Sequence, residues 1–255
     1  MARTKKRISK KRKSRRYRKR KQNGGNDKSK AYVINLDKRT DRWNQIQEKF
    51  KDSSIELERV SAVENADKYL ACSLSHLKVV QMAKDKNLPT VLIFEDDNKP
   101  TENFDKRWQI VKKWLDNNTD KWEIFNGGGA WALFENESHE KEFDIQLKYK
   151  MEENINLFNC KKVLRTNFIY INSNAYDKVL KWSRDLPDKD VTFCIDTYIG
   201  NRNYFNTLCI YPFLGIQENG VSDLMQVNKN TTNEDAHRNN FMNGVLERQI
   251  KKLNS

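Results

Sequence analysis

A short apolar run that ends in three consecutive acids constrains this chain more than any other stretch. Residues 90–94 (TVLIF) are rich in β-branched and aromatic side chains, and no polar alternation marks a solvent-facing side. The run therefore predicts a strand that is buried on both faces. Glu95, Asp96 and Asp97 follow it directly, so they come at the carboxyl end of the strand, the edge at which open α/β sheets bind ligands.

The three adjacent carboxylates predict a site for a hard divalent cation. They repel one another, and water or a cation between them relieves the repulsion. Oxygen ligands on a short turn suit Mg2+ or Mn2+, which commonly also bind the phosphates of a substrate. If the strand continues through the acids, Glu95 and Asp97 point to one side and Asp96 to the other. We therefore expect Asp97 and Glu95 to be the metal ligands; a solvated acidic turn is the alternative interpretation.

Strand and helix patterns alternate along the rest of the chain. The expected strands are residues 31–36, 56–61, 90–94, 122–126, 167–172 and 206–211. The expected helices are residues 40–51, 71–86, 103–116, 173–184 and 192–200. This order favours an α/β fold with a mainly parallel sheet covered by helices. Residues 134–160 are charged and lack periodicity, which predicts a mobile flap beside the site.

The positive charge is concentrated at the amino end of the chain. The formal net charge is +13, and residues 1–21 hold 14 of the 48 Lys and Arg and no acid, which leaves 34 basic against 35 acidic residues. This segment has too few apolar residues to fold. We expect a disordered basic tail over residues 1–29 and one domain over 30–255, with its core at about 30–226 and an extension over 227–255. Such tails bind polyanions, here a nucleic acid or an anionic membrane.

Targeting and redox signals are sparse. No run of about 18 apolar residues is present, as a membrane span requires, and no hydrophobic core follows the basic run, as in a signal peptide. The sequence thus predicts a soluble intracellular protein, cytoplasmic or nuclear. The four cysteines show neither CxxC pairing nor zinc-type spacing with histidine, so we expect reduced, mostly buried thiols.

Four other segments share their order and spacing with a known family. They are residues 32–42 (YVINLDKRTDR), 59–63 (RVSAV), 71–76 (ACSLSH) and 196–223, the last with Asp196-Thr197-Tyr198, Pro212, Gln217 and Ser222-Asp223. Together with the acids, over about residues 30–226, they resemble glycosyltransferase family 25, which includes lipooligosaccharide galactosyltransferases and collagen galactosyltransferase domains. Ala71 departs from the glycine that the family often has there, and Asn174–Tyr176 replaces a common glycine and alanine. Both departures leave the acceptor preference open.

The resemblance implies a fold and a reaction. The fold would be GT-A-like, and the reaction would move a hexose, galactose or glucose, from a UDP-sugar to a hydroxyl of a glycan or protein with inversion. Such activity serves lipopolysaccharide biosynthesis or protein glycosylation. The resemblance also implies Mn2+, or Mg2+, at the acidic motif.

The matching segments supply the candidate site residues. Those expected to bind the donor are Asn35, Arg39, Arg42, His76, Asp96 and Asp223. Arginine grips phosphate, and Asp96 would face the donor sugar or ribose. Asp196 is expected to take the proton from the acceptor hydroxyl. Structural roles stay open for several of these: a surface ion pair for Arg42, a hydrogen-bonded histidine at position 76, and caps or loop hydrogen bonds for Asp196 and Asp223.

A binding protein is the alternative from another class. In that case a catalytically inactive transferase-like scaffold would carry the basic tail, and the tail would bind nucleic acid or another polyanion. Both functions account for the tail. Only a transferase accounts for the acids occurring together with Arg39, Arg42 and Asp196.

Overall fold

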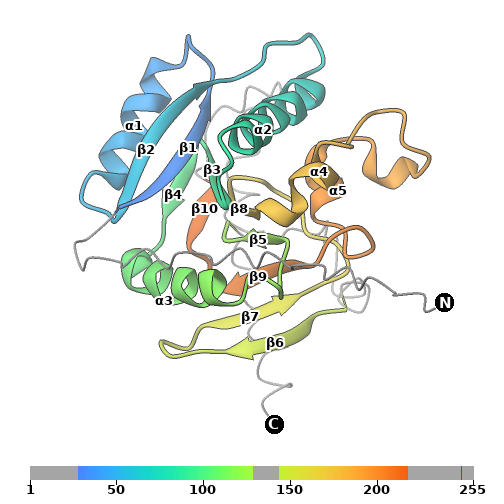
Figure 1. Cartoon of the computed structure of the whole chain (residues 1–255). Coiled ribbons are helices and arrows are strands. Elements are labelled where there is room, and N and C mark those ends of the chain that lie inside the picture. Colours follow the sequence, from blue (N-terminus) through green and yellow to red (C-terminus); the bar gives the residue numbers. More distant parts are fainter. Residues whose placement is uncertain (1–27, 129–143, 218–247, 249–255) are drawn as a thin grey trace, which may run out of the picture.

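Eight strands form one mixed sheet, with helices on both of its faces (Figure 1). The structure, a computed structural model, describes residues 28–128, 144–217 and 248. In order across the sheet, the strands are β2 (Ile55–Ser61), β1 (Ser29–Asn35), β3 (Thr90–Glu95), β8 (Phe168–Asn172), β5 (Ile124–Asn126), β9 (Thr207–Tyr211), β7 (Asn156–Asn159) and β6 (Gln146–Lys150). A second sheet contains only β4 (Asn98–Pro100) and β10 (Gly215–Gln217).

The strand directions divide the large sheet. β1 runs parallel to both β2 and β3, and β5 runs parallel to β9, whereas the other four neighbouring pairs are antiparallel. The predicted fold class, an α/β sheet covered by helices, is confirmed. The sheet is mixed rather than mainly parallel, because β8 lies between β3 and β5 and runs against both of them.

Five α-helices in the described residues pack on the sheet. They are α1 (Thr40–Phe50), α2 (Lys68–Asp85), α3 (Phe104–Asn117), α4 (Tyr176–Val179) and α5 (Ile195–Ile199), with 3-10 turns at Ser173–Ala175 and Lys189–Val191. Three of the predicted helices agree closely, the one expected over 192–200 is shortened to α5, and the one expected over 173–184 is reduced to a 3-10 turn and α4. None of the helices in this described part is long and apolar enough to cross a bilayer.

Strand β3 is buried on both faces, as its sequence predicts. Leu92 and Phe94 join the core under α1 and α3, whereas Val91 and Ile93 join the core under α2, α4 and α5. Successive side chains of a strand point to opposite faces, so an unbroken apolar run serves both cores. The acids therefore follow a strand that is fixed from two sides.

The expected flap is wrong for the residues that the structure describes. Residues 144–160 contain β6 and β7, which pair antiparallel and extend the sheet beyond β9. All four residues of β7 are buried, and both of its ends are asparagine, which hides the strand from an apolar pattern. Residues 129–143 lie outside the described part. So do residues 1–27 of the expected tail and all but Arg248 of the expected extension.

The small β4/β10 sheet joins the acidic turn to a distant segment. Gln217 pairs with Asn98, the residue after the acids, and Gly215 pairs with Pro100. A Cβ at position 215 would lie 2.3 Å from Asn98 Oδ1, so a larger residue would clash with the buried Asn98 side chain. Gln217 is thereby placed next to Asp97.

Phe168 is the centre of the aromatic core on the α1/α3 face, and its removal tests the packing. Its ring contacts those of Phe94, Phe104 and Trp108, and it is fully buried. We expect Phe168→Ala to lower the free energy of unfolding by about 3–5 kcal/mol in urea denaturation. The control Phe193→Ala, at a ring that is 53% exposed, should cost less than about 1 kcal/mol. Equal losses in the two variants would contradict this packing.

Candidate functional site

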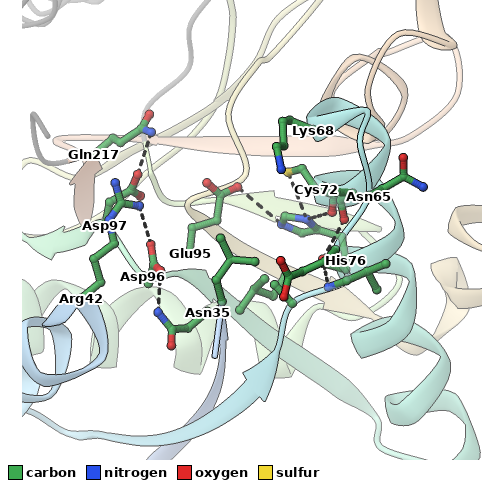
Figure 2. Close-up of a pocket in the computed structure, with 17 residues that line it drawn as sticks. Asn35, Arg42, Asn65, Lys68, Cys72, His76, Glu95, Asp96, Asp97 and Gln217 are labelled. Carbon is green, nitrogen blue, oxygen red and sulfur yellow. Dashed lines mark hydrogen bonds and ion pairs between the residues drawn. The ribbon is translucent and has the colours of Figure 1, made fainter. Parts of the chain in front are cut away.

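The acids line a pocket at the carboxyl ends of β1 and β3 (Figure 2). Its walls come from the residues after β1 and β2, the first half of α2, the acidic turn and Gln217. The space measures about 720 Å³ out to its open mouth. Six of the predicted site residues line it: Asn35, Arg42, His76, Glu95, Asp96 and Asp97. Segments 60 residues apart in sequence thus meet where the sequence predicts a ligand site.

Asp96 is held by two partners from the first strand and helix. Its Oδ2 accepts from Asn35 Nδ2 at 2.7 Å, and its Oδ1 accepts from Arg42 Nη1 at 2.9 Å. The side chains of Arg42 and Asp96 are only 13% and 11% exposed. A cation and hydrogen bonds compensate a buried carboxylate for its lost hydration. Asp96 therefore fixes the turn and anchors Arg42 at the pocket.

The Asn35 side chain is occupied by three internal hydrogen bonds. Besides Asp96, its Nδ2 donates to the Arg39 carbonyl oxygen, and its Oδ1 accepts from Arg59 Nε at 2.8 Å. The residue is buried at the end of β1. Asn35 therefore positions the pocket wall. The predicted contact with the sugar donor would be made by its backbone, because its side chain is already hydrogen-bonded within the protein.

Glu95 and Asp97 carry the uncompensated charge of the pocket. Burial raises the pKa of Glu95 to about 7, although a hydrogen bond from the Thr166 hydroxyl, at 2.5 Å, opposes the shift. Burial also raises the pKa of Asp97 to about 7, and repulsion from Glu95 adds to it. Asp97 Oδ2 accepts from Gln217 Nε2 at 2.9 Å, while its buried Oδ1 has no hydrogen-bond partner among the described residues. Buried carboxylate oxygens with a spare acceptor fit a hard divalent cation.

His76 lies on α2, across Glu95 from the Arg42 side of the pocket (Figure 2). Its Nδ1 is 3.0 Å from the Cys72 carbonyl oxygen, and its Nε2 is 3.6 Å from Glu95 Oε1. Burial lowers the pKa of His76, so the ring is neutral at neutral pH. The predicted donor contact would thus come from a neutral imidazole.

Arg39 and Asp196 are not among the residues that line the pocket. Arg39 donates to both carboxylate oxygens of Asp41 on the surface of α1. Asp196, in the first turn of α5, accepts from the Arg165 backbone N–H at 3.4 Å, and its buried Oδ1 lacks a hydrogen-bond partner within the described part. Its charge still helps to raise the pKa of Glu95. Asp223 lies outside the described residues.

Several residues of the site escape prediction from sequence. Thr166 and Arg165 precede β8 and act on Glu95, one through a hydrogen bond and the other by its charge. Arg165 has a φ of 76°, a left-handed conformation that costs an arginine about 1–3 kcal/mol. Lys68 lies on the rim, at the start of α2. Cys72 and Gln217 did carry a signal, because they belong to the ACSLSH and 196–223 segments.

Comparison with known families decides the class of protein. The sequence profile described as glycosyltransferase family 25 (LPS biosynthesis protein) matches residues 65–199, more than half of the chain. The chain belongs to glycosyltransferase family 25. The matched range contains Cys72, His76, the three acids and Asp196. The resemblance noted in the sequence is therefore confirmed, and this family 25 member is a glycosyltransferase, which requires a sugar donor and an acceptor.

Two solved structures with some likeness to the family 25 chain are a glycosyltransferase and a xylosyltransferase. One is a glycosyltransferase involved in the glycosylation of the major capsid of PBCV-1, with 11% identity, a TM-score of 0.41 and coverage of 83% of this chain and 98% of that one. Another is mouse xyloside xylosyltransferase 1 in its apo form, with 11% identity, a TM-score of 0.37 and 66% coverage of both chains. No curated protein matches significantly. The family assignment rests on the sequence profile and not on these distant likenesses.

The raised pKa values of Glu95 and Asp97 predict how stability varies with pH. In the folded, metal-free protein both pKa values are about 7, up from 4.5 and 3.8, so the folded state binds more protons than the unfolded state between about pH 4 and 7. This stabilisation is complete below about pH 4 and is lost as the pH rises through 7. We expect Asp97→Asn to match the wild type at pH 4 and to exceed it by about 2 kcal/mol or more at pH 8.

Urea denaturation in the presence of a chelator measures this difference. Asp120→Asn, at an exposed acid in the loop after α3, is the control and should track the wild type at every pH. If the free energies of unfolding of Asp97→Asn and the wild type differed by the same amount at every pH, Asp97 would not have the raised pKa.

Proposed function

We propose that this protein is a metal-dependent, inverting hexosyltransferase. It transfers galactose or glucose from a UDP-sugar to a hydroxyl group of a glycan or protein. The observation that carries the proposal is the pair of buried acids, Glu95 and Asp97, that line the pocket with raised pKa values and an unpartnered oxygen. An uncompensated negative site of this kind is suited to a cation and to the phosphates that come with it.

Asp97 and Glu95 would hold Mn2+ or Mg2+. The bound ion would neutralise the negative charge that develops on the departing diphosphate. Gln217 supports this role, because its amide fixes Asp97 Oδ2 and leaves Oδ1 without a hydrogen-bond partner among the described residues. The hydrogen bond from Thr166 likewise orients Glu95.

Two positive side chains suit the pocket to the phosphates of the donor. Arg42 lines the wall with its guanidinium anchored on Asp96, which fixes its plane beside the acidic turn. Lys68 is exposed on the opposite rim and supplies a mobile positive charge. Arg39, paired with Asp41 away from the lining, has a lesser part in donor binding.

Inverting transfer needs a carboxylate to take the proton of the attacking hydroxyl. We assign this role to Asp196, whose buried Oδ1 has no hydrogen-bond partner in the part of the chain that the structure describes. Because Asp196 does not line the pocket, the acceptor would have to approach from the α5 side. Donor and acceptor would then meet near Glu95.

Removal of the Asp97 carboxylate tests the proposal. We expect Asp97→Ala to reduce Mn2+-dependent turnover of UDP-galactose or UDP-glucose by on the order of 100-fold or more, since the ion would lose a ligand. The unfolding temperature should not fall, because the removed carboxylate is destabilising in the metal-free protein. Asp120→Ala is the matched control and should keep full turnover.

Two outcomes would contradict the proposal. One is turnover by Asp97→Ala at the wild-type rate, and the other is a large loss of its thermal stability, which would make Asp97 a structural residue. A variant that starts near Lys28 separates the basic segment from the catalysis. Metal-dependent turnover should survive this truncation, whereas salt-sensitive nucleic-acid binding without turnover would favour the alternative function.

A further inference from the structure

Cys72, His76 and Glu95 lie together on the α2 side of the pocket (Figure 2). Each offers one ligand atom, and these sulfur, nitrogen and oxygen atoms all lie within 4.8 Å of one another. We propose that the three residues bind a thiophilic divalent cation of the zinc class, distinct from the hard cation assigned to Asp97. The inference rests on the ligand geometry alone and does not require glycosyl transfer.

The helix places two of the ligands on one face. Cys72 and His76 are four residues apart on α2, and such residues are neighbours on the helix surface. Cys72 Sγ is 3.8 Å from His76 Nδ1. Nδ1 also lies 3.0 Å from the Cys72 carbonyl oxygen, which assigns the ring proton to Nδ1 and the lone pair to Nε2. A histidine held this way by a backbone carbonyl is typical of metal ligands.

The Nε2 atom of His76 is a buried acceptor without a hydrogen-bond partner in the described residues. His76 is 2% exposed, and Glu95 Oε1 lies 3.6 Å from its Nε2. Glu95 Oε1 already accepts a hydrogen bond from the Thr166 hydroxyl, and a cation between Nε2 and Oε1 would relieve the repulsion between their remaining lone pairs. Tetrahedral zinc separates its nitrogen and oxygen ligands by about 3.3–3.5 Å, which is close to the gap observed.

The chemistry of the donors selects the ion. Thiolate, imidazole and carboxylate together suit Zn2+ or Co2+, whereas Mg2+ and Mn2+ prefer oxygen ligands only. Three protein ligands leave a fourth position for water or a substrate hydroxyl. Glu95 lies between this group and the Arg42, Asp96 and Asp97 group (Figure 2), so its two carboxylate oxygens could serve both sites.

Cobalt provides a spectroscopic test on the full chain. When metal-free protein is titrated with Co2+, one equivalent should give a thiolate-to-cobalt charge-transfer band in the near ultraviolet and the intense visible bands of a tetrahedral ion, whether or not Co2+ also enters the oxygen-ligand site at Asp97. Stoichiometric Zn2+ should abolish both sets of bands. Cys72→Ser should lose the charge-transfer band, and His76→Gln should weaken Co2+ binding at least about 10-fold.

Two further variants serve as a control and as a second test of the ligands. Cys209→Ser removes another buried thiol, on β9, and should leave the cobalt spectrum unchanged. Glu95→Gln keeps the thiol and imidazole and should retain the charge-transfer band with weaker binding, which covers the case of a Cys72→Ser variant that fails to fold. Absence of the band in the wild type would overturn the proposal and leave a shared proton between His76 and Glu95. Its loss in Cys209→Ser, with no change in Cys72→Ser, would also overturn it.

The cobalt spectra do not test glycosyl transfer. Mn2+-dependent turnover of a UDP-sugar, measured on the same preparation, tests the Asp97 site separately. Loss of the cobalt signal together with intact turnover would remove the zinc-class site and leave the proposed function standing.

Discussion

The buried ion pair between Arg42 and Asp96 is the interaction on which the site depends. It ties the turn after β3 to α1, while Asn35 ties the same carboxylate to the end of β1. A buried carboxylate without partners would cost several kcal/mol, so this pairing is what allows three consecutive acids to remain in the protein interior. Asp96 is compensated by the protein itself, whereas Glu95 and Asp97 are compensated by protons or by a cation. The two acids therefore make the pocket suited to bind a cation.

The two sheets fix the positions of these acidic side chains. β3 is packed from both faces, so the turn that follows it cannot relax outward to bring the acids into water. The β4/β10 pair then fixes the other side of the turn and places Gln217 on Asp97. Glu95, between two groups of side chains, faces His76 on α2 (Figure 2). The rigid strands thus hold close together carboxylates that would otherwise move apart.

Local sequence patterns predict the elements of this fold better than their arrangement. The apolar run before Glu95 is enough to predict a strand that is buried on both faces, and the three acids at its carboxyl end are enough to predict a ligand site there. The direction of β8 has no local signal, so the mixed sheet could not be foreseen. The short strands of the β4/β10 pair carry too few residues for a pattern. The contact between Gln217 and Asp97, 120 residues apart, therefore emerges only in three dimensions.

A diffraction experiment tests the central claim most directly. Crystals of the protein soaked with MnCl2 and UDP, measured at the manganese absorption edge, locate the ion and the diphosphate together. We expect one anomalous peak within coordination distance of the Asp97 carboxylate, with the diphosphate on the same ion and near Arg42. A peak remote from the acidic turn, or UDP bound outside this pocket, would contradict the assignment of Glu95 and Asp97 as the centre of a glycosyltransferase site.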